Sequence, residues 1–308
     1  MLIDVHAHIF PRIHGQTAAG PTRGRGYGRI RIGRETLQAL PPCGSRTAFS
    51  AATLIAHMDW ARVDRALLLQ GPYYGACNQY VEEALQLYPA RLWGAACLDP
   101  WAEDAPALWA SGQGLGAFRA VKLECSVPTG LCGLYPEADL GAPALNWLWH
   151  ALESTRRVLV LDLGGVGSRS YQTEAVRAIA LRHPALRIVI AHLGQPTPRA
   201  EADPALWAQW CAQIDLGLLP NVWFDCAALP AYVAEEGYPF PTAGRYLRQA
   251  IERIGADRVM WGTDLPGMLV HATYPQLAQL ALEHTRFLSQ RERALMLGGN
   301  ALRVYAGV

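Results

Sequence analysis

Eight short apolar runs separated by longer segments of helical character recur along this chain, and their alternation constrains the fold more than any other feature. Each run is rich in Val, Ile, Leu or aromatic residues, and most end in Gly, Pro or a polar residue, as buried strands do. Strands that alternate with helices predict parallel βα units, because parallel neighbours need a crossover connection. The runs are LIDVHAHIF (2–10), RALLLQG (65–71), RLWGAACLD (91–99), AFRAVKLEC (117–125), RVLVLDLGG (157–165), RIVIAHLG (187–194), NVWFDCA (221–227) and RVMWGTD (258–264).

Most of the segments between these runs have apolar residues every three or four positions and end at Pro or Gly, which predicts helices. The clearest are 52–63, 78–89, 142–155, 172–184 and 244–255. Eight βα units in 308 residues match the size of an α/β TIM barrel, (β/α)8, and we expect one domain over residues 1–308. An open doubly wound sheet is the alternative, but no GxGxxG motif follows the first run.

The composition is that of a globular protein with a large core, because 51% of the residues are apolar and 17% are charged. A formal net charge of +1 gives no basis for binding nucleic acid or a membrane surface, and no stretch is long and apolar enough for a membrane span. The first residues lack the pattern of a secretory signal. Seven cysteines without a CxxC pair predict reduced thiols in a cytoplasmic protein.

Residues 11–50 form a long insertion after the first predicted strand, with seven arginines, seven glycines and a single acidic residue. The segment that follows a barrel strand lies on the catalytic face, so we expect this Arg/Gly-rich insertion over that face. Gly24, Gly26 and Gly28 favour a mobile loop that acts as a lid. Arginines such as Arg12 suit a substrate that carries a carboxylate.

Polar side chains that are costly to bury gather at the carboxyl ends of the predicted strands. They are His6, His8, Glu124, Asp162, His192 and Asp264. His6 and His8 share one face of the first strand because side chains repeat every two residues, and Asp4 belongs to the same alternation. A single histidine at a strand end is commonly a hydrogen-bonded core residue. In a closed barrel, however, all these groups meet at one mouth, which predicts a divalent ion such as Zn²⁺ or Mn²⁺.

Taken together, these stretches resemble the amidohydrolase superfamily, in its amidohydrolase-related (type 2) branch. The resemblance runs from the first strand to the last helix, so it covers nearly the whole chain. It is specific for the family and leaves the substrate open, since the branch includes hydrolases, lactonases, hydratases and non-oxidative decarboxylases. The matching stretches are IDVHAHIF, AVKLE, RHPALRIVIAHLG, NVWFDCAAL, ADRVMWGTDLPG and GGNALRVY.

The resemblance implies roles for individual residues. His6 and His8 are expected as metal ligands, Asp264 as both a ligand and a proton-handling group, and His192 as the group that polarises the substrate or moves a proton. The chain departs from the family at the fifth strand, where a ligand histidine is usual and this sequence has Asp162. Either Asp162 or Glu124 is then the further ligand, and the alternative is a metal that is weakly held, or absent as in some lactonases of this branch. The implied cofactor is one divalent ion, zinc before manganese or magnesium, and a second ion stays open.

Lys122 lies on the same side of its strand as Glu124 and is placed to neutralise that carboxylate. His14 and His271 follow the first and eighth strands, so both are candidates for contact with the substrate. The apolar segment LWAQWCAQI (206–214) is a candidate surface for a homodimer.

The leading functional hypothesis is metal-dependent hydrolysis of a C–N or C–O bond, in an amide, lactone or ester, by activated water. The substrate is expected to be a small molecule that carries a carboxylate. The alternative is metal-dependent, non-oxidative decarboxylation of an aromatic or unsaturated acid. A third, non-catalytic hypothesis is a barrel that binds an acidic metabolite, and it predicts binding without any product.

Overall fold

The computed structural model describes residues 1–112, 115–127 and 129–307, so residues 113–114, 128 and 308 of the predicted domain lie outside the description. The eight predicted strands are all present, and they form a single parallel sheet in sequence order. They are β1 (Ile3–Ala7), β6 (Arg65–Leu68), β7 (Leu92–Cys97), β8 (Ala120–Glu124), β9 (Val158–Asp162), β10 (Ile188–Ile190), β11 (Val222–Asp225) and β12 (Val259–Met260).

The last strand returns to the first, so the sheet closes into a barrel. The backbone N–H of Val5 donates to the carbonyl of Trp261 at 3.1 Å, and the N–H of Asp264 donates to the carbonyl of His6 at 2.7 Å. An open doubly wound sheet does not have sequential strand order or this closing contact. The (β/α)8 prediction is therefore confirmed.

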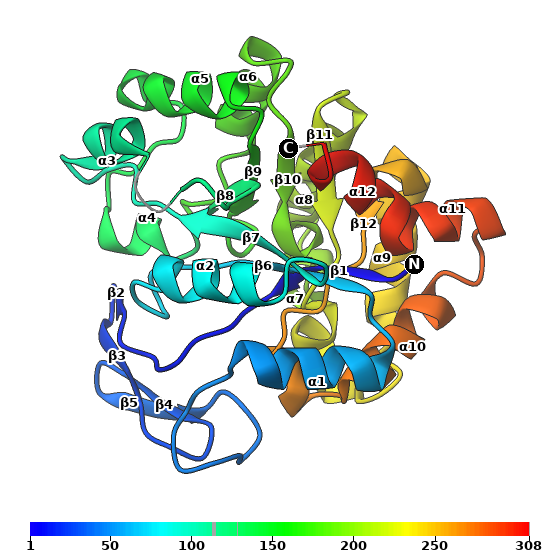
Figure 1. The fold of residues 1–308 in the computed structure, drawn as a ribbon. Helices are drawn as coiled ribbons and strands as arrows, with labels where there is room; N and C mark the ends of the chain where they lie inside the picture. The colour runs from blue at the N-terminus through cyan, green and yellow to red at the C-terminus, as the bar shows by residue number, and fades with distance from the viewer. Residues whose placement is uncertain (113–114, 128, 308) are drawn as a thin grey trace.

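Helices surround the barrel and connect its strands (Figure 1). Local signals begin several of them: Ser50 caps the helix that starts at Ala51, and Thr273 forms a capping box with Gln276. None of the helices in the described part of the chain has the length and apolar character needed to cross a membrane. The helices are α1 (Ala51–Ala61), α2 (Asn78–Leu87), α3 (Ala105–Ser111), α4 (Leu131–Leu134), α5 (Asn146–Ser154), α6 (Thr173–Arg182), α7 (Pro198–Ala202), α8 (Pro204–Ile214), α9 (Pro241–Ile254), α10 (Tyr274–His284), α11 (Gln290–Ala294) and α12 (Asn300–Tyr305).

The insertion after β1 is folded into a sheet and is not an irregular loop, and its expected mobility and action as a lid stay predictions. It forms a four-stranded antiparallel sheet of β2 (Gln16–Thr17), β3 (Gly20–Gly24), β4 (Arg29–Ile32) and β5 (Glu35–Gln38). This sheet projects from one edge of the molecule below α2 (Figure 1). Its first residues contact the loop after β6: the N–H of Gln16 donates to Pro72 at 3.1 Å, and Thr22 Oγ1 donates to Tyr73.

Two apolar cores support the barrel. The inner core fills the barrel, and α12 closes its amino-terminal end by adding Ala301, Val304 and Tyr305 to it. The outer core lies between the strands and the surrounding helices. The aromatic residues of α8 belong to this outer layer, since Trp207 stacks on Trp210 with ring centroids 4.3 Å apart. The homodimer through this segment stays a prediction.

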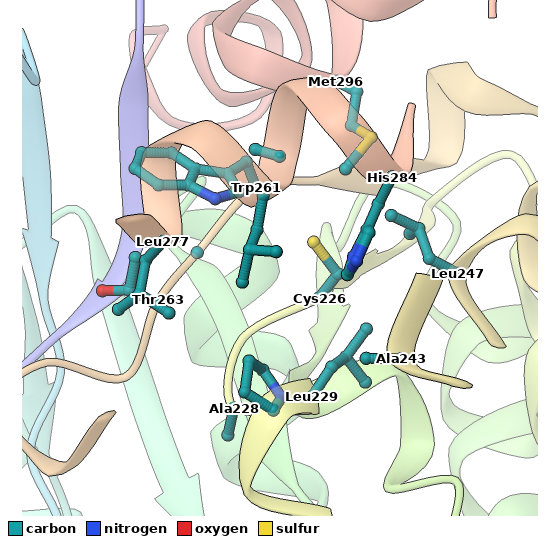
Figure 2. Close-up of a pocket in the computed structure, with 14 residues that line it drawn as sticks. Cys226, Ala228, Leu229, Ala243, Leu247, Trp261, Thr263, Leu277, His284 and Met296 are labelled. Carbon is teal, nitrogen blue, oxygen red and sulfur yellow. The ribbon is translucent and has the colours of Figure 1, made fainter. Parts of the chain in front are cut away.

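Figure 2 shows a small apolar cavity in the outer layer, where Cys226 and Trp261 face Leu247 of α9 and Leu277 of α10. Its volume is about 40 Å³. Pockets that bind small molecules usually measure some hundreds of Å³, so this cavity is a packing feature and not a substrate site.

Candidate active site

The predicted polar residues converge at the carboxyl end of the barrel, and all of them except His6 line a pocket of about 220 Å³. Register brings some of them together directly, because Glu124 at the end of β8 pairs with Asp162 at the end of β9. The residues that line the pocket are His8, Gly71, Tyr73, Tyr74, Lys122, Glu124, Thr129, Asp162, His192 and Asp264.

A register shift in β1 between Asp4 and Ala7 sets which side chains enter the barrel. Val5 packs in the inner core, and His6 follows it towards the mouth. Asp4 instead faces outwards and accepts a hydrogen bond from Tyr274 Oη of α10 at 2.8 Å. The alternation therefore places Asp4 wrongly on the face of the two histidines, because a bulge adds one residue to the strand.

The two histidines and Asp264 present their donor atoms to one another. His8 Nε2 lies 2.9 Å from Asp264 Oδ1, and His6 Nε2 lies 3.8 Å from the same oxygen. The three residues form a cluster whose ligand atoms lie within 4.8 Å of one another. Two imidazole nitrogens and one carboxylate oxygen at these separations match the ligand set of a divalent transition metal.

The other ring nitrogen of each histidine is held by the protein. His6 Nδ1 lies 3.0 Å from Asp225 Oδ2, and His8 Nδ1 lies 2.7 Å from the carbonyl oxygen of Leu69. Both partners are acceptors, so each Nδ1 carries a proton, which leaves Nε2 of each ring as the nitrogen that would ligate a metal. Burial lowers the pKa of His6 to about 4, which keeps that ring neutral. The tautomer and the neutral charge of His6 fit metal ligation at its Nε2.

Asp225, at the end of β11, is a site residue that the sequence analysis missed. It is completely buried, and its Oδ1 accepts from the backbone N–H of His192 at 2.9 Å and of Ala227 at 3.1 Å. Its Oδ2 orients His6. The signal was available, because Asp225 ends the seventh apolar run just as Asp162 ends the fifth.

His192 and Asp162 form a buried pair in which Nε2 and Oδ2 lie 3.1 Å apart. Burial alone favours the neutral imidazole, but the charge of Asp162 and its hydrogen bond outweigh burial and raise the pKa of His192 to about 10. The ring is therefore a cationic donor at neutral pH. His192 has a left-handed backbone with φ of 59°, a conformation that is costly for a non-glycine residue and is found preferentially at functional sites.

Glu124 is paired with Lys122, as the sequence predicted, with Oε2 lying 3.3 Å from Nζ. Ser126 Oγ also donates to Glu124. Burial and the neighbouring charge of Asp162 raise the pKa of Glu124 to about 7. Neither Glu124 nor Asp162 belongs to a possible metal-ligand cluster within the described ranges, and the role of either as a further ligand stays a prediction.

Asp264 follows β12 with φ of 71°, in the left-handed region. The segment is held by Asp4, which accepts from Thr263 Oγ1 at 2.5 Å and from the Thr263 N–H at 3.0 Å. Burial disfavours the Asp264 carboxylate, but the hydrogen bond from His8 and the nearby histidines outweigh it and hold its pKa below the usual range. Asp264 is therefore ionised and faces His8.

The predicted substrate residues lie around the pocket and not in its lining, as far as the described residues show. Arg12 is exposed. His14 packs against the backbone of Gly75 in the loop after β6, and its Nδ1 is buried. His271 is half-buried at the end of the turn that follows Asp264. Their roles stay predictions.

A closed (β/α)8 barrel with histidines, carboxylates and a buried histidine–carboxylate ion pair at its carboxyl mouth defines a class of catalytic barrel. A family model described as Amidohydrolase matches residues 3–307. The chain therefore belongs to the amidohydrolase family, which confirms the resemblance seen in its motifs. Members of this family depend on a metal ion, and this chain has residues that can hold one.

Individual relatives are more distant. The chain is 31% identical over 145 residues to an L-fucono-1,5-lactonase of Burkholderia multivorans, a match that covers 44% of this chain and 48% of the relative. The chain thus spans about half the length of the curated relatives it matches. An amidohydrolase structure from Burkholderia multivorans with bound zinc has a TM-score of 0.71 at 21% identity, with 99% of both chains covered. A probable 2-pyrone-4,6-dicarboxylic acid hydrolase of Acinetobacter baumannii with citric acid bound has a TM-score of 0.69 at 20% identity, again with 99% of both chains covered. At these identities the structures show the shared fold.

Proposed function

We propose that this protein hydrolyses a C–O or C–N bond, in a lactone, ester or amide, of a small anionic substrate. The reaction uses one divalent metal ion, zinc before manganese or magnesium, held by His6, His8 and Asp264. The observation that carries the proposal is that His6 Nε2 and His8 Nε2 both face Asp264 Oδ1, and that His8 and Asp264 line the pocket. A lactone is the first substrate class to test, because the curated relatives are L-fucono-1,5-lactonases.

A divalent ion bound there supplies a Lewis acid that polarises a carbonyl and makes water more acidic. The chain's own groups then handle protons and charge. Asp264 Oδ accepts the proton of the attacking water and delivers it to the leaving oxygen or nitrogen. His192, protonated through Asp162, donates a hydrogen bond to the oxygen on which negative charge develops. Asp225 keeps His6 in the required tautomer.

The preference for an anion rests on the buried cations of the pocket. Lys122 is 3% exposed and His192 is 5% exposed, and both line it. Lys122 Nζ lies 3.5 Å from His6 Nε2, so its charge is directed at the reaction centre. The volume of about 220 Å³ suits a small molecule. Arg12, His14 and His271 are proposed as outer contacts for a carboxylate.

The test is hydrolysis of a panel of lactones, including L-fucono-1,5-lactone and 2-pyrone-4,6-dicarboxylate, by the zinc-loaded protein and by Asp264→Ala. Acid release is followed with a pH indicator, and folding is checked by circular dichroism. Wild-type turnover that is lost in the folded Asp264→Ala variant supports the proposal. Full turnover in that variant refutes the role of Asp264, and ligand binding without product favours the non-catalytic hypothesis.

Decarboxylation is the second candidate, and the observation that favours it is that two buried cationic side chains, Lys122 and His192, line the pocket. Lys122 and His192 suit a substrate carboxylate, and a protonated His192 is a proton source for the carbon that loses CO₂. Release of CO₂ from an aromatic acid, with no ¹⁸O from labelled water in the organic product, identifies this reaction. Incorporation of ¹⁸O into a product acid identifies hydrolysis.

Three further expectations are part of the proposal. The whole of residues 1–308 acts as one domain, with the insertion 11–50 over the catalytic face, a placement that the hydrogen bonds to Pro72 and Tyr73 support. The protein works in the cytoplasm, which agrees with seven free cysteines. We also propose a homodimer through residues 206–214, and we expect no nucleic acid or membrane partner.

A further inference from the structure

A second group of potential metal ligands lies outside the pocket, on two consecutive barrel helices. His150 and Glu153 are three residues apart on α5, so they share a face of that helix. His183 directly follows α6. One ligand atom from each of the three residues lies within 4.8 Å of the others.

Hydrogen bonds within the protein fix the side chains of Glu153 and His183 in this group. His183 Nδ1 lies 3.0 Å from Glu153 Oε2, and the other carboxylate oxygen accepts from the Ala185 N–H at 3.0 Å, which fixes the carboxylate. The rings of His150 and His183 lie 4.7 Å apart, nearly perpendicular. His183 is 1% exposed, and its Nε2 is buried without a hydrogen-bond partner in the described structure. His150 is exposed, so an ion can reach the group from solvent.

We propose that His150, Glu153 and His183 form a peripheral binding site for a divalent transition metal such as Zn²⁺, with water completing the coordination. Two imidazoles and one carboxylate are a common ligand set for this ion. In the neutral-histidine state the site carries the single negative charge of Glu153, which attracts a cation. This site is independent of the pocket, since none of its residues lines the pocket.

The location predicts the effect of binding. The ends of α5 and α6 lie at the amino-terminal end of the barrel, where Arg187, at the end of the same turn, donates to the carbonyl of Val304 on α12. In (β/α)8 barrels, contacts at the amino-terminal end contribute to stability, whereas the chemistry takes place at the carboxyl-terminal end. An ion at this site joins α5 to the turn before β10, so it raises the melting temperature and leaves kcat/KM unchanged.

The test compares wild type with His150→Gln. Glu252→Gln is the control, because Glu252 is an exposed carboxylate on α9 whose partner is Arg248. Each full-length protein is dialysed to equilibrium against ZnCl₂, and bound zinc is counted by elemental analysis. We expect wild type and Glu252→Gln to bind one zinc ion per chain more than His150→Gln at saturation. Zinc should also raise the melting temperatures of wild type and Glu252→Gln by more than it raises the melting temperature of His150→Gln.

Equal zinc counts in wild type and His150→Gln overturn the proposal, and so does a loss of one ion in Glu252→Gln. The result is independent of the proposed function. A catalytic pocket that binds no metal lowers the count of all three proteins by the same amount, and the difference at His150 remains. His150 is exposed, so its replacement by Gln leaves the core intact, and circular dichroism checks this.

Discussion

Replacing Asp225 by Asn tests whether Asp225 controls metal binding by orienting His6, since Asp225 is not itself one of the proposed ligands. Asp225 Oδ1 accepts two backbone N–H groups, from His192 and Ala227, so the Asn oxygen must stay there. The Asn NH₂ group then faces His6 Nδ1, which in wild type carries a proton. Two donors cannot bond, so His6 adopts the other tautomer and places its proton on Nε2, the nitrogen that faces Asp264.

The magnitude follows from the contact that is lost. A buried hydrogen bond to a charged group contributes about 1.5–3 kcal/mol. Since about 1.4 kcal/mol is a factor of ten, Asp225→Asn should weaken zinc affinity by ~10- to 150-fold. Side chains that orient metal-bound histidines commonly have effects of this order. The expected fall in kcat/KM at limiting zinc is of the same size.

The assay is competition of the protein with a chelator of known zinc affinity, for wild type, Asp225→Asn and the control Asp215→Asn. Asp215 is a surface carboxylate paired with Arg253, so its replacement should leave zinc affinity unchanged. Thermal unfolding verifies that each variant is folded. Unchanged zinc affinity in a folded Asp225→Asn protein would refute the reasoning about the tautomer of His6.

Three other predictions concern stability and cofactor dependence. Asn300 is fully buried and donates to the carbonyls of Ala256 and Val259 at 2.8 Å each, so Asn300→Ala should lower the free energy of unfolding by about 1–3 kcal/mol per carbonyl left unpaired, measured by urea denaturation. The hydrogen bond from Arg245 holds the pKa of Glu201 below its ordinary value of 4.5. This ion pair stabilises the folded protein above pH 4.5, so Glu201→Gln should lower the free energy of unfolding by under about 1 kcal/mol at neutral pH. The difference from wild type should shrink as the pH falls through the lowered pKa of Glu201. A difference that does not change with pH contradicts this prediction. Removal of metal by a chelator should abolish hydrolysis, and zinc should restore it.

The pattern of apolar runs was enough to predict most of the fold. Eight buried runs with Val, Ile and Leu on both faces are typical of parallel strands, and their boundaries predicted every barrel strand within a few residues. The pattern also located the mouth, because strand ends in a closed barrel converge whatever the loops do. His8, Glu124, Asp162, His192 and Asp264 all line the pocket for this reason.

The rest depended on contacts between distant segments. The bulge in β1 is set by how β1 pairs with β6, so strict alternation assigned Asp4 to the wrong face. The glycines at positions 24, 26 and 28 favour an irregular loop in the insertion, and the sheet that it forms was not predicted. Yet Arg29–Ile32 pairs with Glu35–Gln38 across a turn in which Gly33 has φ of 55°, a conformation glycine adopts readily. The alternating RIRI sequence before this glycine was the signal for a hairpin.

Anomalous diffraction at the zinc absorption edge, from crystals grown with zinc, tests the central claim most directly. The account predicts a peak about 2.0–2.1 Å from the Nε2 atoms of both His6 and His8, with an Asp264 oxygen in the same coordination sphere. A zinc-loaded, active protein that shows no peak between these three side chains would contradict it.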